Sequence, residues 1–156
     1  MDPQQLLECF VGTLNQNAQV RSQAEQHLKE ASKVPGFLGA CLDIISSEQA
    51  PNSVKLSASL YFKNKILYGW SSTFKTKNEL LNIKIDQDEK PVIKELFIKA
   101  LTSCSALSPG CLRILQPALN TIVVFDYRNG KWDQLLPESL RLLSTNDINA
   151  AHIGLL

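Results

Sequence analysis

The sequence predicts an all-α fold, a right-handed α-solenoid in which pairs of helices stack in about three and a half repeats. Apolar residues recur at helical spacing along most of the 156 residues, and no segment requires a β-sheet. Helix pairs return at intervals of about 35 to 55 residues, which is typical of solenoids of HEAT or armadillo type. Because one pair cannot bury its apolar faces alone, neighbouring repeats must pack together.

Composition excludes several function classes. With 44% hydrophobic residues and a net charge of +1, the chain has no overall field that would recruit nucleic acid or hold it on an anionic membrane. Glu8 interrupts the first apolar stretch and no basic region precedes it, so no signal peptide is predicted. No run approaches the roughly 20 apolar residues of a membrane span. We therefore expect a soluble, intracellular protein that forms one domain over 1–156.

The first repeat is predicted over about 1–33. Asp2 is the expected N-cap, with Pro3 at the first helical position. Asn17 is expected to cap a second helix that runs to about Ala31. The positions expected to face inward in these two helices are Leu6, Leu7, Phe10, Val11, Leu14, Val20, Ala24 and Leu28.

The second repeat is predicted over about 34–75. A helix over 37–46 is followed by a turn, and Asn52 or Ser53 is expected to cap a long helix that ends at Trp70. The shorter helix is expected to bury Leu38, Cys41, Leu42 and Ile45.

The long helix is apolar around most of its circumference. We therefore expect it to be covered on two sides, with a narrow polar and aromatic stripe left open to a partner. The first covered face is expected to hold Leu56, Leu60, Lys63, Leu67 and Trp70, and the second Ala58, Phe62, Ile66 and Gly69. The open stripe is expected to hold Ser57, Tyr61, Asn64 and Tyr68, with Lys65 at its edge.

Residues 73–88 are predicted to form a loop or a partly ordered insertion, because their apolar residues lack a period. The third repeat is predicted over about 88–127, with one helix from Asp88 or Glu89 and a second capped by Ser108. Its inward positions are expected to be Ile93, Leu96, Phe97, Ala100, Leu101, Cys104, Leu112, Leu115, Leu119, Ile122 and Val123.

The fourth repeat is predicted over about 128–156. A turn over 126–130 leads into a helix over 132–144, and a last helix is predicted over 147–156. Because that helix stops within an apolar pattern, we expect the chain to be an N-terminal fragment of a longer one.

No catalytic or metal-binding set is expected. The four cysteines lie among apolar helical residues without a CxxC pair, and we interpret them as reduced, mostly buried thiols. They are Cys9, Cys41, Cys104 and Cys111. No nucleophile elbow, glycine-rich phosphate loop or HExxH motif is present in the sequence. We predict a binding protein without a cofactor, not an enzyme.

The segment from 49 to 78 contains five lysines and no acidic residue. This local excess of positive charge can attract an acidic partner, although a solvated lysine surface is the alternative. The lysines are Lys55, Lys63, Lys65, Lys75 and Lys77.

Three motifs occur together along the chain. Residues 21–28 match R-x-x-A-E-x-x-L, and residues 55–70 match K/R-x-x-A/S-x-x-x-x-K-N-x-I followed by a tryptophan. A third motif has an aspartate between two aromatic residues at 125–127, then Trp132, and then the sequence LLP at 135–137. Together these motifs resemble the N-terminal domain of the importin-β superfamily, the karyopherins that carry cargo through nuclear pores. The resemblance covers essentially the whole chain.

The resemblance implies a HEAT-type solenoid that binds the small GTPase Ran in its GTP form through the second helices of its repeats. It also implies protein cargo, held mainly on repeats outside this chain, and nucleoporins as partners, without direct binding to nucleic acid or membrane. A protein that shuttles between cytoplasm and nucleus is implied as well. The side chains we nominate for the GTPase are Tyr61, Asn64, Lys65 and Tyr68.

Within the superfamily, residues 31–37 and 61–65 are most similar to fungal relatives of the importin seven and eight subfamily. Two features depart from a regular HEAT pattern. Pro117 lies inside a predicted helix, where it should produce a kink, and the 73–88 connection is long. The local geometry of the third repeat therefore stays open.

Other interpretations also remain open. Asn64 could hydrogen-bond a neighbouring loop, while Trp70 and Trp132 are interpreted as packing anchors. Arg21 and Glu25 could form a surface pair or a bridge between repeats. For the whole chain, the alternatives are a HEAT scaffold subunit of a phosphatase or kinase assembly, and an enzyme.

The stripe on the long helix leads to a testable expectation. Replacing Tyr61 and Tyr68 by alanine should weaken GTPase binding and leave helicity, measured by circular dichroism, nearly intact. Leu60→Ala should instead cost roughly 2 to 5 kcal/mol through a cavity. Unfolding of the tyrosine variants would show that the stripe is part of the core.

Overall fold

The computed structural model describes residues 2–71, 77, 83–102, 107–144, 154 and 155. All regular structure within these ranges is helical, which confirms the predicted all-α class. The helices are α1 (Pro3–Thr13), α2 (Ala18–Ala31), α3 (Phe37–Ser46), α4 (Asn52–Gly69), α5 (Glu89–Thr102), α6 (Pro109–Ile122), the π-helix η2 (Val123–Tyr127) and α7 (Leu135–Leu143). Apart from Gly154 and Leu155, the helix predicted over 147–156 lies outside the described residues, as do Lys75 and Cys104.

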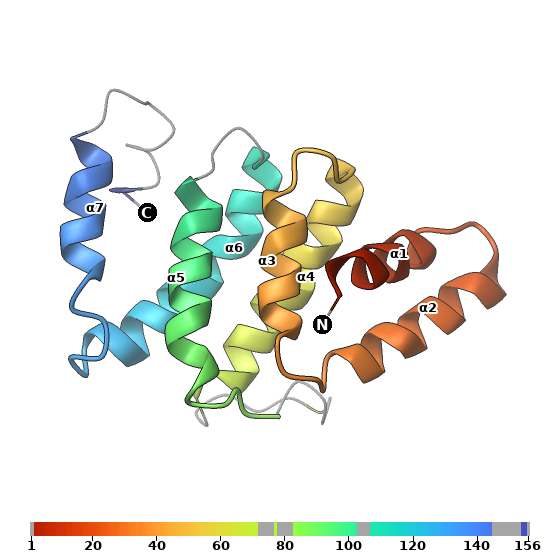
Figure 1. Ribbon diagram of the computed structural model, residues 1–156, viewed down its shortest axis with the longest axis horizontal. Helices are drawn as coiled ribbons and strands as arrows, with labels where there is room; N and C mark the ends of the chain where they lie inside the picture. Colours follow the sequence, from red (N-terminus) through yellow and green to blue (C-terminus); the bar gives the residue numbers. More distant parts are fainter. Residues whose placement is uncertain (1, 72–76, 78–82, 103–106, 145–153, 156) are drawn as a thin grey trace.

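The helices are arranged in two layers (Figure 1). Helices α3, α5 and α7 lie side by side in one layer, with α4 and α6 behind them and the α1–α2 pair at one end of the row. Helix α4 is central, because it packs against α1, α3 and α6. This arrangement is a HEAT-type α-solenoid, as the periodicity predicts.

Side-chain caps begin three of the helices where the sequence predicts them. In each case a side-chain oxygen accepts a hydrogen bond from a backbone N–H of the first turn, which would otherwise lack a partner. Asp2 accepts from the N–H of Gln4 at 3.0 Å, Asn17 from that of Gln19 at 2.9 Å and Ser108 from that of Cys111 at 3.3 Å.

Two predicted helix starts are wrong. Helix α4 already includes Asn52 and Ser53, and its N-cap is Pro51, which has no side-chain donor or acceptor to offer. Helix α7 begins at Leu135 instead of Trp132, because a turn intervenes and Trp132 itself is buried.

The N-terminal ends of α3 and α5 are joined by a hydrogen bond. Gly36 has a φ of 85°, a left-handed conformation that favours glycine, and it places its N–H 2.6 Å from Oε1 of Glu89. This bond ties the second repeat to the third across 53 residues of sequence.

A continuous core runs between the layers. Phe62 of α4 meets Phe97 of α5 with ring centroids 4.9 Å apart, and both side chains are fully buried. Trp70 and Trp132 are also buried, which confirms that they pack inside the fold.

The inward positions of the first repeat are partly wrong. Val11 and Leu14 are each 49% exposed and Val20 is 39% exposed, whereas Leu6, Phe10, Ala24 and Leu28 are buried as predicted. The α1–α2 pair has a neighbouring repeat on one side only, so its other side stays open to solvent.

Helix α6 passes through Pro117, whose side chain lies on the exposed surface. The π-helix η2 then follows directly, where the sequence predicts a turn beginning at Asp126. The chain turns only after it, through Gly130 at a φ of 65°.

None of the helices in the described ranges is both long enough and apolar enough to cross a lipid bilayer.

The Phe62–Phe97 contact can be tested on α5. Phe97→Ala should lower the free energy of unfolding by about 3 to 5 kcal/mol, because it empties a fully buried site. Val92→Ala on the same helix is the control, since Val92 is 55% exposed and should change stability by no more than about 0.5 kcal/mol. Urea denaturation measures both, and equal losses would contradict this core.

Candidate functional site

The surface of α4 that its neighbours leave open is one continuous arc. From Val54 to Gly69, every residue outside this arc is buried. We call it the α4 arc, and its members are Leu56, Ser57, Leu60, Tyr61, Lys63, Asn64, Leu67 and Tyr68. The predicted polar stripe is therefore open, but it is only half of the open surface.

The other half is a face that the sequence assigns to the core. Leu60 is 43% exposed, the largest exposure among the hydrophobic residues of α4. Helices α1, α3 and α6 occupy the remaining sides of α4, so Leu60 stays exposed and Leu56 and Leu67 stay partly exposed. The expectation that Leu60→Ala opens a cavity is accordingly wrong.

Two of the lysines expected at the surface are buried. Lys55 is only 6% exposed and Lys65 only 7%. Burial lowers the pKa of the Lys65 ammonium, and the nearby Glu89 carboxylate partly opposes that shift. Lys65 therefore belongs to the packing between α4 and the start of α5, and its nomination as a GTPase contact is not supported by its place in the fold.

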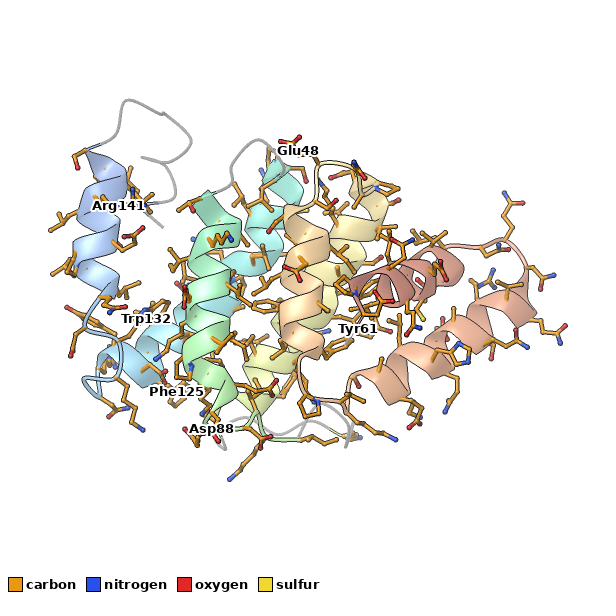
Figure 2. The ribbon with its side chains drawn as sticks, viewed as in Figure 1. Glu48, Tyr61, Asp88, Phe125, Trp132 and Arg141 are labelled. Carbon is orange, nitrogen blue, oxygen red and sulfur yellow. The ribbon has the colours of Figure 1, made fainter. Side chains whose placement is uncertain are left out.

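Tyr61 is half-buried at the edge of the α4 arc that faces the first repeat (Figure 2). Its ring packs edge-on against Phe10 with centroids 5.5 Å apart. Burial raises the pKa of its hydroxyl, and the charge of Glu25 raises it further. Tyr61 thus contributes to packing between helices as well as to the open surface.

Asn64 and Tyr68 lie in the middle of the α4 arc and are partly exposed. Among the hydrogen bonds of the described residues, none involves the Asn64 amide or the Tyr68 hydroxyl. The alternative that Asn64 binds a neighbouring loop therefore has no support there. Both groups are available to a partner.

Helix α6 extends the open surface. A Cβ added at the exposed Gly110 would lie 3.1 Å from Cδ2 of Leu56, so α6 meets α4 at the edge of the α4 arc. Neither helix contains an acidic residue. The exposed residues that α6 and η2 add include Arg113, Gln116, Asn120, Val124 and Tyr127.

Sequence reasoning missed these residues of α6 and η2. The signal that could identify them is helical spacing, since Arg113, Gln116 and Asn120 recur at three- and four-residue intervals opposite the apolar stripe of α6. The π-helix hides the continuation, because its wider turn changes the register after Ile122.

The arginine of the R-x-x-A-E-x-x-L motif forms its hydrogen bonds within the first repeat. Arg21 donates hydrogen bonds to the carbonyl oxygens of Asn15 and Gln16, both at 3.0 Å. It thereby fixes the loop that joins α1 to α2. In the described residues it forms no ion pair with Glu25.

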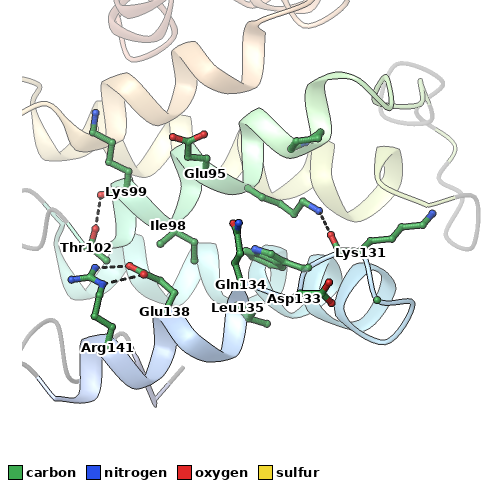
Figure 3. A pocket seen from close by; sticks show the side chains of 14 residues that line it. Glu95, Ile98, Lys99, Thr102, Lys131, Asp133, Gln134, Leu135, Glu138 and Arg141 are labelled. Atoms are coloured by element: carbon green, nitrogen blue, oxygen red, sulfur yellow. Dashed lines mark hydrogen bonds and ion pairs between the residues drawn. The ribbon is translucent and has the colours of Figure 1, made fainter.

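A groove of about 770 Å³ separates α5 from α7 (Figure 3). Ile98 and Leu135 contribute apolar surface to it, and Glu138 pairs with Arg141 one turn away. That pairing lowers the pKa of the Glu138 carboxyl. A carboxylate held by an arginine on its own helix is suited to stabilising the surface and poorly suited to accepting a proton at neutral pH.

The described part of the chain contains no group of three or more histidine, cysteine or acidic residues that could hold a metal ion. Cys41 and Cys111 are buried free thiols, as predicted, and Cys9 is half-buried. Burial raises the pKa of Cys41 well above its usual range, so this thiol stays protonated and unreactive.

Comparison with known proteins defines the family. The family model described as "Importin-beta N-terminal domain" matches residues 24–103. The chain is 56% identical over its whole length to "Nonsense-mediated mRNA decay protein 5" of Saccharomyces cerevisiae, and 29% identical over 94% of its length to "Importin-8" of Danio rerio. It spans only 15% and 14% of these two relatives, so their activities as whole proteins are not carried over directly.

A solved structure is similar in fold, with a TM-score of 0.73 and 17% identity over 100% of this chain and 18% of the other. That structure is described as showing that Kap95p binding induces the switch loops of RanGDP to adopt the GTP-bound conformation. The solenoid and its open two-helix surface define a helical-repeat binding protein. More narrowly, the chain belongs to the importin-β family, within which it carries the N-terminal domain.

The corrected face of α4 gives a stability test. Leu60→Ala should change the free energy of unfolding by no more than about 0.5 kcal/mol, because the side chain is exposed. Ile66→Ala is the matched comparison on the same helix and should cost about 2 to 5 kcal/mol, since Ile66 is fully buried. Chemical denaturation that ranks the two in the opposite order would contradict the α4 arc.

Proposed function

We propose that this chain is the part of a nuclear transport receptor that binds the small GTPase Ran in its GTP form, through the open surface of α4 and α6. The observation that carries the proposal is that surface itself, an acid-free pair of neighbouring helices with an exposed leucine and partly exposed tyrosine. Such a mixture of apolar, aromatic and amide groups is suited to a protein partner.

Family membership and the fold support the choice of partner. The chain carries the family's N-terminal domain, and the solenoid of similar fold is described in a complex with RanGDP. With no carboxylate on α4 or α6, Lys63 and Arg113 add positive charge that favours an acidic partner surface. Lys65 is omitted from the proposed contacts because it is buried.

Import of protein cargo through the nuclear pore is the process we assign to the whole receptor. Cargo and nucleoporins would bind chiefly to repeats beyond this chain, and the receptor would move between cytoplasm and nucleus. Release of cargo requires that GTPase binding and cargo binding disfavour each other, which is a coupling free energy between two sites. A HEAT scaffold of another assembly would show no such dependence on the GTPase.

Calorimetry with both nucleotide forms tests the proposal. The folded chain should bind Ran loaded with a non-hydrolysable GTP analogue more tightly than Ran loaded with GDP. Because the similar solenoid is described with RanGDP, the ratio of the two affinities is the measurement that decides, and not the mere presence of binding. Equal affinities, or no binding by well-folded chain, would favour the scaffold interpretation.

Asn64 and Tyr68 are the nominated residues that are partly exposed and make no side-chain hydrogen bond among the described residues, and Tyr68 is the larger of the two. Tyr68→Ala should weaken binding to the GTP form about tenfold, or ~1.4 kcal/mol, and leave the unfolding midpoint nearly unchanged. Val92→Ala is the control, because Val92 is exposed on α5, outside the proposed surface. The same affinity for both variants would remove Tyr68 from the interface.

A further inference from the structure

A buried polar network links the C-terminal ends of α4 and α6. The carboxylate of Asp126 in η2 accepts a hydrogen bond from Nε1 of Trp70 at 3.0 Å and from Nζ of Lys94 at 3.0 Å. Both partners are distant in sequence, by 56 and 32 residues. Asp126 is 6% exposed and Trp70 is 3% exposed, so these bonds are shielded from water.

Helix α5 fixes the network from the other layer. Nζ of Lys94 also donates to the carbonyl oxygen of Lys131 at 2.7 Å, a bond drawn in Figure 3. Lys90, one turn earlier, donates to the carbonyl oxygen of Trp70 at 2.9 Å and lies over its ring, 5.1 Å from the centroid. Two lysines of α5 therefore form hydrogen bonds to the end of α4, to η2 after α6 and to the segment that leads to α7.

Within the described residues, Asp126 is the carboxylate that pairs with Lys94 and lies near enough to act on Lys90. Burial lowers the pKa of Lys90, the charge of Asp126 partly opposes that shift, and the neighbouring lysines add to it. The side chain of Lys94 is only 11% exposed, so removing the carboxylate would leave a buried ammonium facing other positive charges. The ends of α4 and α6 would then lose the charged group in the polar contact between them.

The network lies at the C-terminal ends of the two helices that carry the proposed binding surface. Tyr68, in the α4 arc, is two residues before Trp70, and the exposed Val124 and Tyr127 flank Asp126. The Trp70–Asp126 bond thus joins the two helices within two residues of Tyr68, Val124 and Tyr127, which are open to solvent. Groups that bind a partner need such supporting hydrogen bonds to hold their geometry.

We propose that Asp126 is a positioning residue for GTPase binding, which acts by holding the ends of α4 and α6 at a fixed separation. This inference rests on the proposed function. Asp126 itself is buried, so in this proposal it does not contact the GTPase.

Asp126→Asn is the variant that tests it, because asparagine keeps the size and an acceptor for Trp70 but loses the charge that Lys94 requires. Trp70→Phe is the second variant, since it keeps an aromatic ring and removes the N–H donor. Each should weaken binding to GTP-loaded Ran roughly five- to tenfold. Leu42→Ala in the core of α3 is the control for a loss of stability alone, and its affinity should stay within twofold of the wild type wherever the chain is folded.

Two readouts separate positioning from general destabilisation. The chain has only two tryptophans, so the indole N–H signal of Trp70 can be followed by NMR, and it should shift and exchange faster in Asp126→Asn but not in Leu42→Ala. In a double-mutant cycle, Tyr68→Ala should cost less in the Asp126→Asn background than in the wild type, because Tyr68 is already misplaced there.

The outcomes are distinct. If the wild-type chain does not bind the GTPase, the proposed function fails and the inference fails with it. If the wild type binds and Asp126→Asn binds equally well, or if the two substitutions simply add, Asp126 has no positioning role and the proposed function stands.

Discussion

The packing of α4 between α1, α3 and α6 is the constraint on which the rest of this structure depends. Three neighbours cover the helix along Val54, Ala58, Phe62 and Ile66 and leave one arc uncovered. The burial of Phe62 against Phe97 contributes to the stability of the solenoid, and the uncovered arc is the surface that we propose for a partner. The buried contacts and the proposed binding surface therefore lie on opposite sides of the same helix.

The helices themselves could largely be predicted from the sequence, because the signals that begin and end them are local. Asp2, Asn17 and Ser108 each cap the helix that follows, and the apolar spacing of α3 and α6 identifies their buried sides. A cap needs only its own first turn, so no knowledge of the fold is required. The three motifs together predicted the importin-β family, and the match to the family model confirms that prediction.

The open face of α4 could not be predicted in the same way. Apolar residues surround α4, so periodicity cannot distinguish the side that packs from the side that a partner would cover, and Leu60 was placed on the wrong one. The burial of Lys65 depends on its approach to the start of α5, and the acceptor role of Asp126 depends on Trp70 and Lys94. These are contacts between repeats, and a single sequence does not specify them.

The proposed function requires the α4 arc to be open in the free chain and covered in the complex. Hydroxyl-radical footprinting, read out by mass spectrometry, measures this directly for Leu60 and Tyr68, with the buried Phe62 as an internal reference. We expect Leu60 and Tyr68 to be oxidised much faster than Phe62 in the free chain and to be protected when GTP-loaded Ran is added. Slow oxidation of Leu60 in the free chain, or rates that do not change on binding, would contradict the account.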